Sequence, residues 1–246
     1  MSRFRRWLGR LTGTHIFRTL PRGIDLSADL ARWLPGFRGE VVFDAGSHHG
    51  QSAERFLRWF PAARVYCFEP VAESYALLKQ NLAGAARVRC FQLALGASPG
   101  QAAIRREGPP DMYAIDELTR PERGSPGETI PVETVDRFSA REGIEHISLL
   151  KVDTEGHDLA VLEGAKGLLG RQAIDLIQVE AGWNPGNRRH VPVEAFKTHL
   201  EARGYRLFGV YQQVGEWPTG EPHLRRADLV FVSGAAIRRE GQPHAD

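Results

Sequence analysis

The sequence predicts a doubly wound α/β fold, in which a mostly parallel sheet of seven strands carries helices on both faces and ends in a C-terminal antiparallel strand. Three observations predict it. An apolar run at residues 41–43 leads through Asp44 into a turn that contains Gly46. A second apolar run ends at Glu69, roughly 20 residues later, as in nucleotide-binding α/β domains. Farther on, apolar runs alternate with helical patterns, which favours parallel strands joined by crossovers.

The individual elements follow from the spacing of apolar residues and from the turns between them. The predicted strands of the sheet are residues 40–44, 64–68, 87–95, 146–152, 174–179, 205–210 and 228–232. The predicted helices are residues 25–34, 51–59, 71–82, 135–142, 159–169 and 193–203. The first of these helices is placed over the ligand cleft. The last two strands are expected to form an antiparallel pair, because no convincing helix separates them.

One stretch, at residues 97–131, breaks the alternation. Glycine and proline punctuate polar sequence there, and we expect a short hairpin near 101–106 followed by a flexible region near the cleft. Regular structure returns with a segment at 129–133.

Composition excludes several classes of protein. A chain of 246 residues with a formal charge of +2 and no basic stripe among aromatic residues argues against nucleic-acid binding. The two cysteines, Cys67 and Cys90, fall in predicted inner strands and are expected to be small buried hydrophobes in a reducing, cytoplasmic environment. The sequence contains no run of 18 apolar residues and therefore predicts no membrane-spanning helix.

The N-terminal region differs from the rest, and we divide the chain into a basic helical extension at 1–38, the α/β domain at 39–236 and a frayed tail at 237–246. Phe4, Trp7, Leu8 and Leu11 follow helical spacing among arginines, which predicts a basic amphipathic helix over residues 1–12. Such a helix packs its apolar face on the domain or on a second subunit of a homodimer. The alternative is contact with the anionic inner face of a membrane.

Asp44 decides between the nucleotide cofactors that such a fold binds. Dinucleotide binding needs a G-x-G-x-x-G turn, whereas Gly46 is followed by three side chains before Gly50. At the end of its strand, the Asp44 carboxylate is expected to face the cleft, where it repels a pyrophosphate and attracts a sulfonium or an ammonium. With Glu69 accepting hydrogen bonds from ribose hydroxyls, the pattern favours S-adenosylmethionine, and so methyl transfer over hydride transfer.

Acidic residues also end two later strands, at Asp153 and Glu180, and are expected to point into the same crevice. Asp153, Glu155 and His157 are candidate general bases for deprotonating an acceptor hydroxyl, and the pKa of histidine best matches neutral pH. Glu180 and Trp217, which lies on the connection between the last two strands, are candidate substrate contacts. The alternative is Mg²⁺ held by the carboxylates. We favour no metal, because no acidic pair follows the fifth strand.

The chain resembles the FkbM family of S-adenosylmethionine-dependent methyltransferases. The resemblance rests on VFDAGSHHG at residues 42–50, FEP at 68–70, and LKVDTEGHD at 150–158 running on to VLEGA at 161–165. It covers about residues 40–233, and the third segment is the most specific. His48 departs from the family, which usually has asparagine there. The resemblance implies a Rossmann-like class I methyltransferase fold and O-methylation of a hydroxyl on a sugar, a glycan or a related natural product.

The site expected from these residues joins a cofactor subsite to a reaction centre. The predicted cofactor contacts are Asp44, Gly46, Ser47, His48, Gly50, Glu69, Pro70, Leu95 and Asp153. The acceptor is expected to be a small molecule or a glycan. Competing functions are methylation of nitrogen or carbon, a catalytically silent cofactor-binding scaffold subunit and, last, a nicotinamide-dependent dehydrogenase.

Overall fold

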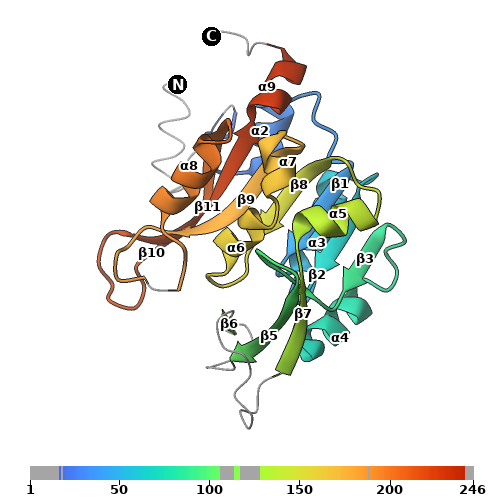
Figure 1. Ribbon diagram of the computed structural model, residues 1–246. Coiled ribbons are helices and arrows are strands. Elements are labelled where there is room, and N and C mark those ends of the chain that lie inside the picture. Colours follow the sequence, from blue (N-terminus) through green and yellow to red (C-terminus); the bar gives the residue numbers. More distant parts are fainter. Residues whose placement is uncertain (1–16, 18, 106–113, 117–127, 188, 242–246) are drawn as a thin grey trace.

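The computed structural model describes residues 17, 19–105, 114–116, 128–187 and 189–241. The predicted helix over residues 1–12 and most of the stretch at 106–127 lie outside this part of the chain. Figure 1 shows a central twisted sheet between two layers of helices. The predicted doubly wound α/β fold is confirmed.

The main sheet has seven strands in the order β10-β11-β9-β8-β1-β2-β3. Their bounds are β1 Val41–Ala45, β2 Arg64–Phe68, β3 Val88–Phe91, β8 Ile147–Val152, β9 Ile174–Gly182, β10 Tyr205–Gly215 and β11 Leu224–Ser233. All neighbouring pairs are parallel except those of β11, which runs antiparallel to both β9 and β10. The expected antiparallel pair at the C-terminus is therefore confirmed.

Alternation along the strands divides the core into two layers. Val41, Phe43 and Ala45 point to one face, where they pack with α5 Val135–Arg141, α6 Asp158–Glu163, α7 Lys166–Gly170 and α8 Val193–Glu201. Val42 points to the other face, which is covered by α2 Leu26–Trp33, α3 Gln51–Trp59, α4 Ala72–Asn81 and α9 Gly234–Glu240. A sheet buried on both faces explains why its central strands are almost continuously apolar.

A second, smaller sheet was not expected. It has the order β4-β7-β5-β6, with β4 Ala94–Leu95, β5 Gly100–Arg105, β6 Ala114–Asp116 and β7 Glu128–Glu133. The predicted strand 87–95 is wrong as one unit, because its last two residues leave the main sheet and pair in parallel with β7. The hairpin expected near 101–106 is larger, since β5 pairs antiparallel with both β6 and β7. Ala94, Ala102 and Ile130 bury their side chains in a small core of their own.

Two helical predictions also need correction. The helix expected over 159–169 is instead two short helices, α6 and α7, which are separated at residues 164–165. At Gly164 an added Cβ would lie 2.0 Å from the carbonyl oxygen of Gly96. The tail expected to fray from Ile237 instead continues α9 to Glu240. Its N-cap Ser233 accepts a hydrogen bond from the Ala236 amide, and Arg239 forms an ion pair with Asp175.

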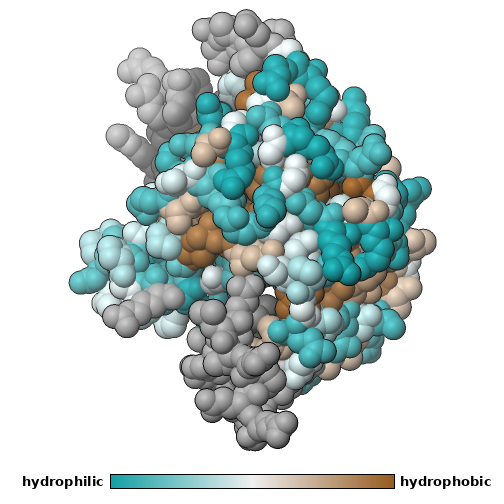
Figure 2. Space-filling model, in the orientation of Figure 1, coloured by the Kyte–Doolittle hydropathy of each residue, from teal (hydrophilic) through white to brown (hydrophobic). Residues whose placement is uncertain are grey.

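One face of the molecule is mostly hydrophilic. On the face drawn in Figure 2, hydrophilic residues cover most of the helices, and apolar residues emerge in the gaps between them. Among the described residues, none of the helices combines the length and the apolar character that crossing a bilayer requires.

Candidate active site

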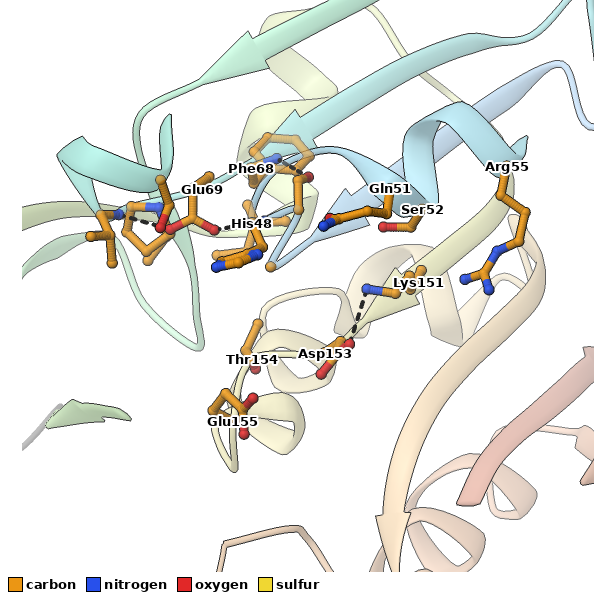
Figure 3. A pocket seen from close by; sticks show the side chains of 17 residues that line it. His48, Gln51, Ser52, Arg55, Phe68, Glu69, Lys151, Asp153, Thr154 and Glu155 are labelled. Atoms are coloured by element: carbon orange, nitrogen blue, oxygen red, sulfur yellow. Dashed lines mark hydrogen bonds and ion pairs between the residues drawn. The ribbon is translucent and has the colours of Figure 1, made fainter. Parts of the chain in front are cut away.

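A cavity of about 370 Å³ opens where the carboxyl ends of β1, β2 and β8 meet. Figure 3 shows the side chains that line it. The turn after β1 contributes the predicted contacts Gly46, Ser47 and His48. The predicted residues Glu69, Pro70 and Leu95 form one wall, and Asp153 and Glu155 form the opposite side. Helix α2, expected over this cleft, packs its Leu26 and Leu30 into the core beneath the sheet and does not line the cavity.

The turn after β1 is fixed by its neighbours on both sides. Gly46 has φ +79°, and an added Cβ would lie 1.9 Å from the carbonyl oxygen of Asp153, so that only glycine fits between β1 and β8. The hydroxyl of Ser47 donates to the Asp44 carbonyl (2.7 Å) and accepts from the Phe68 amide (3.1 Å). The turn therefore holds the ends of three neighbouring strands together at the cavity.

Glu69 is a preorganised acceptor in the wall of the cavity. Its side chain is buried, Oε2 accepts a hydrogen bond from the His48 amide (2.9 Å), and Oε1 accepts one from the Val71 amide (3.0 Å). A carboxylate has about four acceptor positions, so two backbone donors leave it able to accept more bonds. Glu69 thus fits the predicted role of accepting hydrogen bonds from a diol.

Asp44 does not face the cavity, and this expectation is wrong. Its carboxylate is fully buried below the lining, where Oδ2 accepts a hydrogen bond from the Ser52 hydroxyl (2.8 Å). Oδ1 lies 3.3 Å from Nζ of Lys151, which lines the cavity. The uncompensated negative charge that was expected to select the ligand is therefore neutralised by a lysine. Asp44 acts on the cavity through the two side chains that it holds.

Lys151 lies between two carboxylates, since its Nζ is also 3.3 Å from Oδ2 of Asp153. Burial lowers the pKa of Lys151, but Asp153 and Asp44 together raise it above its ordinary value. Burial raises the pKa of Asp153, yet the lysine outweighs this effect and holds it below the ordinary value. Asp153 is consequently an ionised acceptor at neutral pH, and its side chain is 38% exposed toward the cavity.

The segment after Asp153 places only part of the predicted reaction centre at the cavity. Glu155 lines it and accepts a hydrogen bond from Nε of Arg189 (2.5 Å). His157 immediately precedes α6 and does not line the cavity. Asp158 is buried, and its carboxylate accepts hydrogen bonds from the amides of Thr154 (3.3 Å) and Gly156 (3.2 Å). Of the three candidate bases, Asp153 and Glu155 line the cavity and His157 does not.

Three further predicted residues lie away from the cavity. Gly50 is the N-cap of α3, where an added Cβ would meet Leu82 of the α4 end at 3.0 Å, so its role is in packing. Glu180 bridges His190 (Oε2 to Nε2, 2.6 Å) and Arg226 instead of pointing into the crevice, because β9 continues two residues beyond it. Trp217 is 74% exposed.

Several lining residues were missed from the sequence, among them Ser52, Arg55 and Lys151. Lys151 had a recognisable signal, because a single lysine interrupts the apolar run of a central strand and must find a partner when buried. Ser52 and Arg55 had none, because a polar residue on a helix is ordinarily explained by its solvated face.

Comparison with known proteins agrees with this geometry. The model of the family described as the methyltransferase FkbM domain matches residues 44–207, from the end of β1 into β10. The chain belongs to the FkbM methyltransferase family. The methyl donor of this FkbM methyltransferase is S-adenosylmethionine.

Individual relatives of the FkbM methyltransferase are distant. The 2-O-methyltransferase NoeI of Sinorhizobium fredii is 28% identical over 142 residues, which are 52% of this chain and 58% of NoeI. The methyltransferase sdnD of Sordaria araneosa is 28% identical over 209 residues, 72% of this chain and 76% of sdnD. The match to NoeI thus spans little more than half of its length. An rRNA methylase structure from Streptococcus thermophilus has a TM-score of 0.47 at 12% identity, covering 84% of this chain and 93% of that one.

The cavity residues of the FkbM methyltransferase fit this donor. Glu69 offers fixed acceptors for ribose hydroxyls. Gly46 lets the turn lie directly against the end of β8, because the place of a side chain is taken by the carbonyl group of Asp153. Lys151, which lines the cavity, is already held by two carboxylates, so that its own charge is not free to bind a phosphate group.

Proposed function

We propose that this FkbM methyltransferase transfers a methyl group from S-adenosylmethionine to a hydroxyl of a sugar, a glycan or a related natural product. The observation that carries the proposal is the pair of acidic residues, Glu69 and Asp153, at opposite sides of one cavity. One acid is fixed by backbone amides and suits the donor, whereas the other is a partly exposed, ionised group that suits an acceptor hydroxyl. The description of NoeI as a 2-O-methyltransferase supports transfer to oxygen.

When bound, the donor supplies an electrophilic methyl group on a sulfonium leaving group. The protein then needs only to hold the acceptor hydroxyl in line with that methyl group and to accept its proton. We assign Asp153 to accept the hydrogen bond, and then the proton, of the acceptor hydroxyl. Its low pKa suffices, because an oxygen that has bonded to the methyl carbon is a strong acid and loses its proton readily. Lys151 keeps Asp153 ionised. His157 has no part in this assignment.

The decisive experiment incubates the protein with labelled S-adenosylmethionine and an extract of cell-envelope glycans, followed by mass spectrometry of the methylated sugars. A label on a sugar oxygen supports the proposal. A label on nitrogen or carbon, or donor binding without turnover, would replace it with one of the competing functions. The same assay with EDTA tests for a metal. Loss of activity with rescue by Mg²⁺ would show that a metal ion, and not Asp153 as a base, activates the acceptor hydroxyl.

The assignment of the proton acceptor has its own test. We expect Asp153→Asn to lower kcat by about 10²- to 10⁴-fold, with donor affinity measured by calorimetry within a few-fold of wild type. Glu145→Gln, at an exposed acid that does not line the cavity, is the matched control. His157→Ala should retain kcat. If His157→Ala loses activity while Asp153→Asn keeps it, the histidine is the base.

A further inference from the structure

Arg55 is a charged residue of the cavity lining for which the described part of the chain supplies no hydrogen-bonding or ion-pair partner. It projects from α3, on the same side as Gln51 and Ser52, and all three line the cavity. Its Nε is buried and has no hydrogen-bond partner. Within the described part of the chain, no carboxylate lies within ion-pair distance of its guanidinium group. The neighbouring rings of Phe56 and Trp59 hold the side chain by cation–π contacts, 5.9 and 5.5 Å from their centroids.

Other charged groups near Arg55 already have polar partners. Lys151 is shared between Asp44 and Asp153. Asp228 of β11 is buried and accepts a hydrogen bond from Nε2 of Gln178 (2.7 Å). Burial raises its pKa, and the nearby charges of Lys151 and Arg55 offset only part of that effect. A guanidinium group facing a cavity without a counter-ion is costly unless a ligand supplies the negative charge.

The position of Arg55 indicates which ligand group this is. Figure 3 shows Glu69 near one end of the row of lining residues and Arg55 near the other, with Lys151 and Asp153 between them. The donor has its ribose hydroxyls on one side of the sulfonium and an α-amino acid on the other. If the ribose lies at Glu69, the amino acid extends along α3 toward Arg55. A guanidinium group is the side chain best suited to a carboxylate, because it offers paired N–H donors.

We propose that Arg55 binds the α-carboxylate of S-adenosylmethionine and thereby selects a donor that carries an intact amino acid. This inference rests on the cofactor of the proposed function and is independent of the acceptor. A carboxylate on an acidic acceptor sugar has the same chemistry, and the experiment separates the two sources.

The experiment compares the affinities of two ligands by isothermal titration calorimetry. S-adenosylmethionine carries the carboxylate, and its decarboxylated form lacks only that group. Wild type should bind the intact donor about 10- to 100-fold more tightly, as expected for a charge-assisted hydrogen-bonded pair. Arg55→Met should lose most of this preference while binding the decarboxylated form as wild type does. Arg55→Lys keeps the charge without the paired donors, and its preference for the intact donor should lie between those of wild type and Arg55→Met.

Controls separate a specific role from a fold defect. Arg58→Met changes an exposed arginine of the same helix and should leave both affinities unchanged. Thermal melts of Arg55→Met and Arg55→Lys show whether each variant is folded, and the lysine variant keeps the test valid if the methionine variant is not.

Three results would overturn the inference. In the first, Arg55→Met weakens both ligands equally. In the second, it leaves the preference intact and instead raises KM for an acidic acceptor, so that the carboxylate belongs to the acceptor. In the third, wild type binds neither ligand, which refutes the cofactor itself and with it the proposed function.

Discussion

Lys151 is a buried charge whose position organises the polar part of the cavity. It lies in the middle of the sheet on β8, 3.3 Å from one carboxylate beneath the cavity and 3.3 Å from another at its edge. Desolvating an ammonium group costs several kcal/mol, and close carboxylates offset that cost. Of the two carboxylates, Asp44 depends more on Lys151, because Asp44 is fully buried and its Oδ1 makes no hydrogen bond.

The first prediction concerns this pair. Lys151→Met should lower the free energy of unfolding by about 3–5 kcal/mol, because it leaves the Asp44 carboxylate buried without a counter-charge. Urea denaturation at neutral pH measures the change, and adding Asp44→Asn should recover part of it. Lys197→Met, which breaks an exposed pair with Glu201, should cost less than about 1 kcal/mol. Equal effects of the two lysine substitutions would show that Lys151 is not a structural counter-ion.

Asp158 gives a prediction on pH. Burial and the nearby charge of Asp153 raise its pKa from 3.8 to about 6. The folded chain therefore binds more protons than the unfolded chain between those values, so this group favours folding at low pH and its contribution is lost as pH rises through 6. Relative to Asp158→Asn, wild type should gain about 1 kcal/mol in unfolding free energy from pH 7.5 to pH 5. A constant difference across that range would contradict the raised pKa.

Among the elements, the contact between the β1 turn and the end of β8 sets the shape of the site. Adjacent parallel strands bring their carboxyl ends together, and here the backbone of the turn touches the backbone of Asp153 with no room for a side chain. The same close approach of two backbones occurs at Gly164, between α6 and α7, which leaves no room for a side chain beside Gly96. Both glycines are at places where the backbone itself is the packing surface.

The β1 turn yields a prediction on binding and stability together. Gly46→Ala should destabilise the fold by several kcal/mol, because it needs both a left-handed backbone and space that the Asp153 carbonyl occupies. It should also abolish measurable donor binding in calorimetry, because the added methyl group pushes the turn and Asp153 apart and so changes the shape of the cavity. Gly170→Ala is the control, because an added Cβ there meets no atom within 4 Å and its stability should stay within about 1 kcal/mol. Normal binding by Gly46→Ala would show that the turn adapts.

At the scale of the whole molecule, the strand order makes the site. β1 lies between β2 and β8, although β8 follows β1 by about 100 residues in the chain. The acid after β2 and the acid after β8 therefore face one cavity from opposite sides. A ligand of this cavity binds only the folded state, in which these strand ends are together, and therefore stabilises that state.

This linkage predicts a thermal shift. S-adenosylhomocysteine at about 100 times its Kd should stabilise the fold by about 2.7 kcal/mol, which raises Tm by about 5–10 °C for a chain of this size. NAD at the same concentration should leave Tm unchanged. Glu69→Ala should reduce the shift, whereas Glu73→Ala, an exposed acid of α4, should not. An NAD shift as large as that of S-adenosylhomocysteine would reopen the dinucleotide alternative.

The sequence by itself determined how strands and helices of the main sheet follow one another along the chain, the glycine turn and the acid at Glu69, because apolar periodicity and strand-end motifs are local properties. Strand β2 and helix α3 have the predicted bounds. Only the tertiary structure decided which side chains face the ligand. Asp44 is turned beneath the cavity by Lys151, and Arg55 is brought to it from the next helix. Such pairings depend on which strands and helices become neighbours, and a buried charge takes the partner that the fold places beside it, wherever that partner lies in the chain.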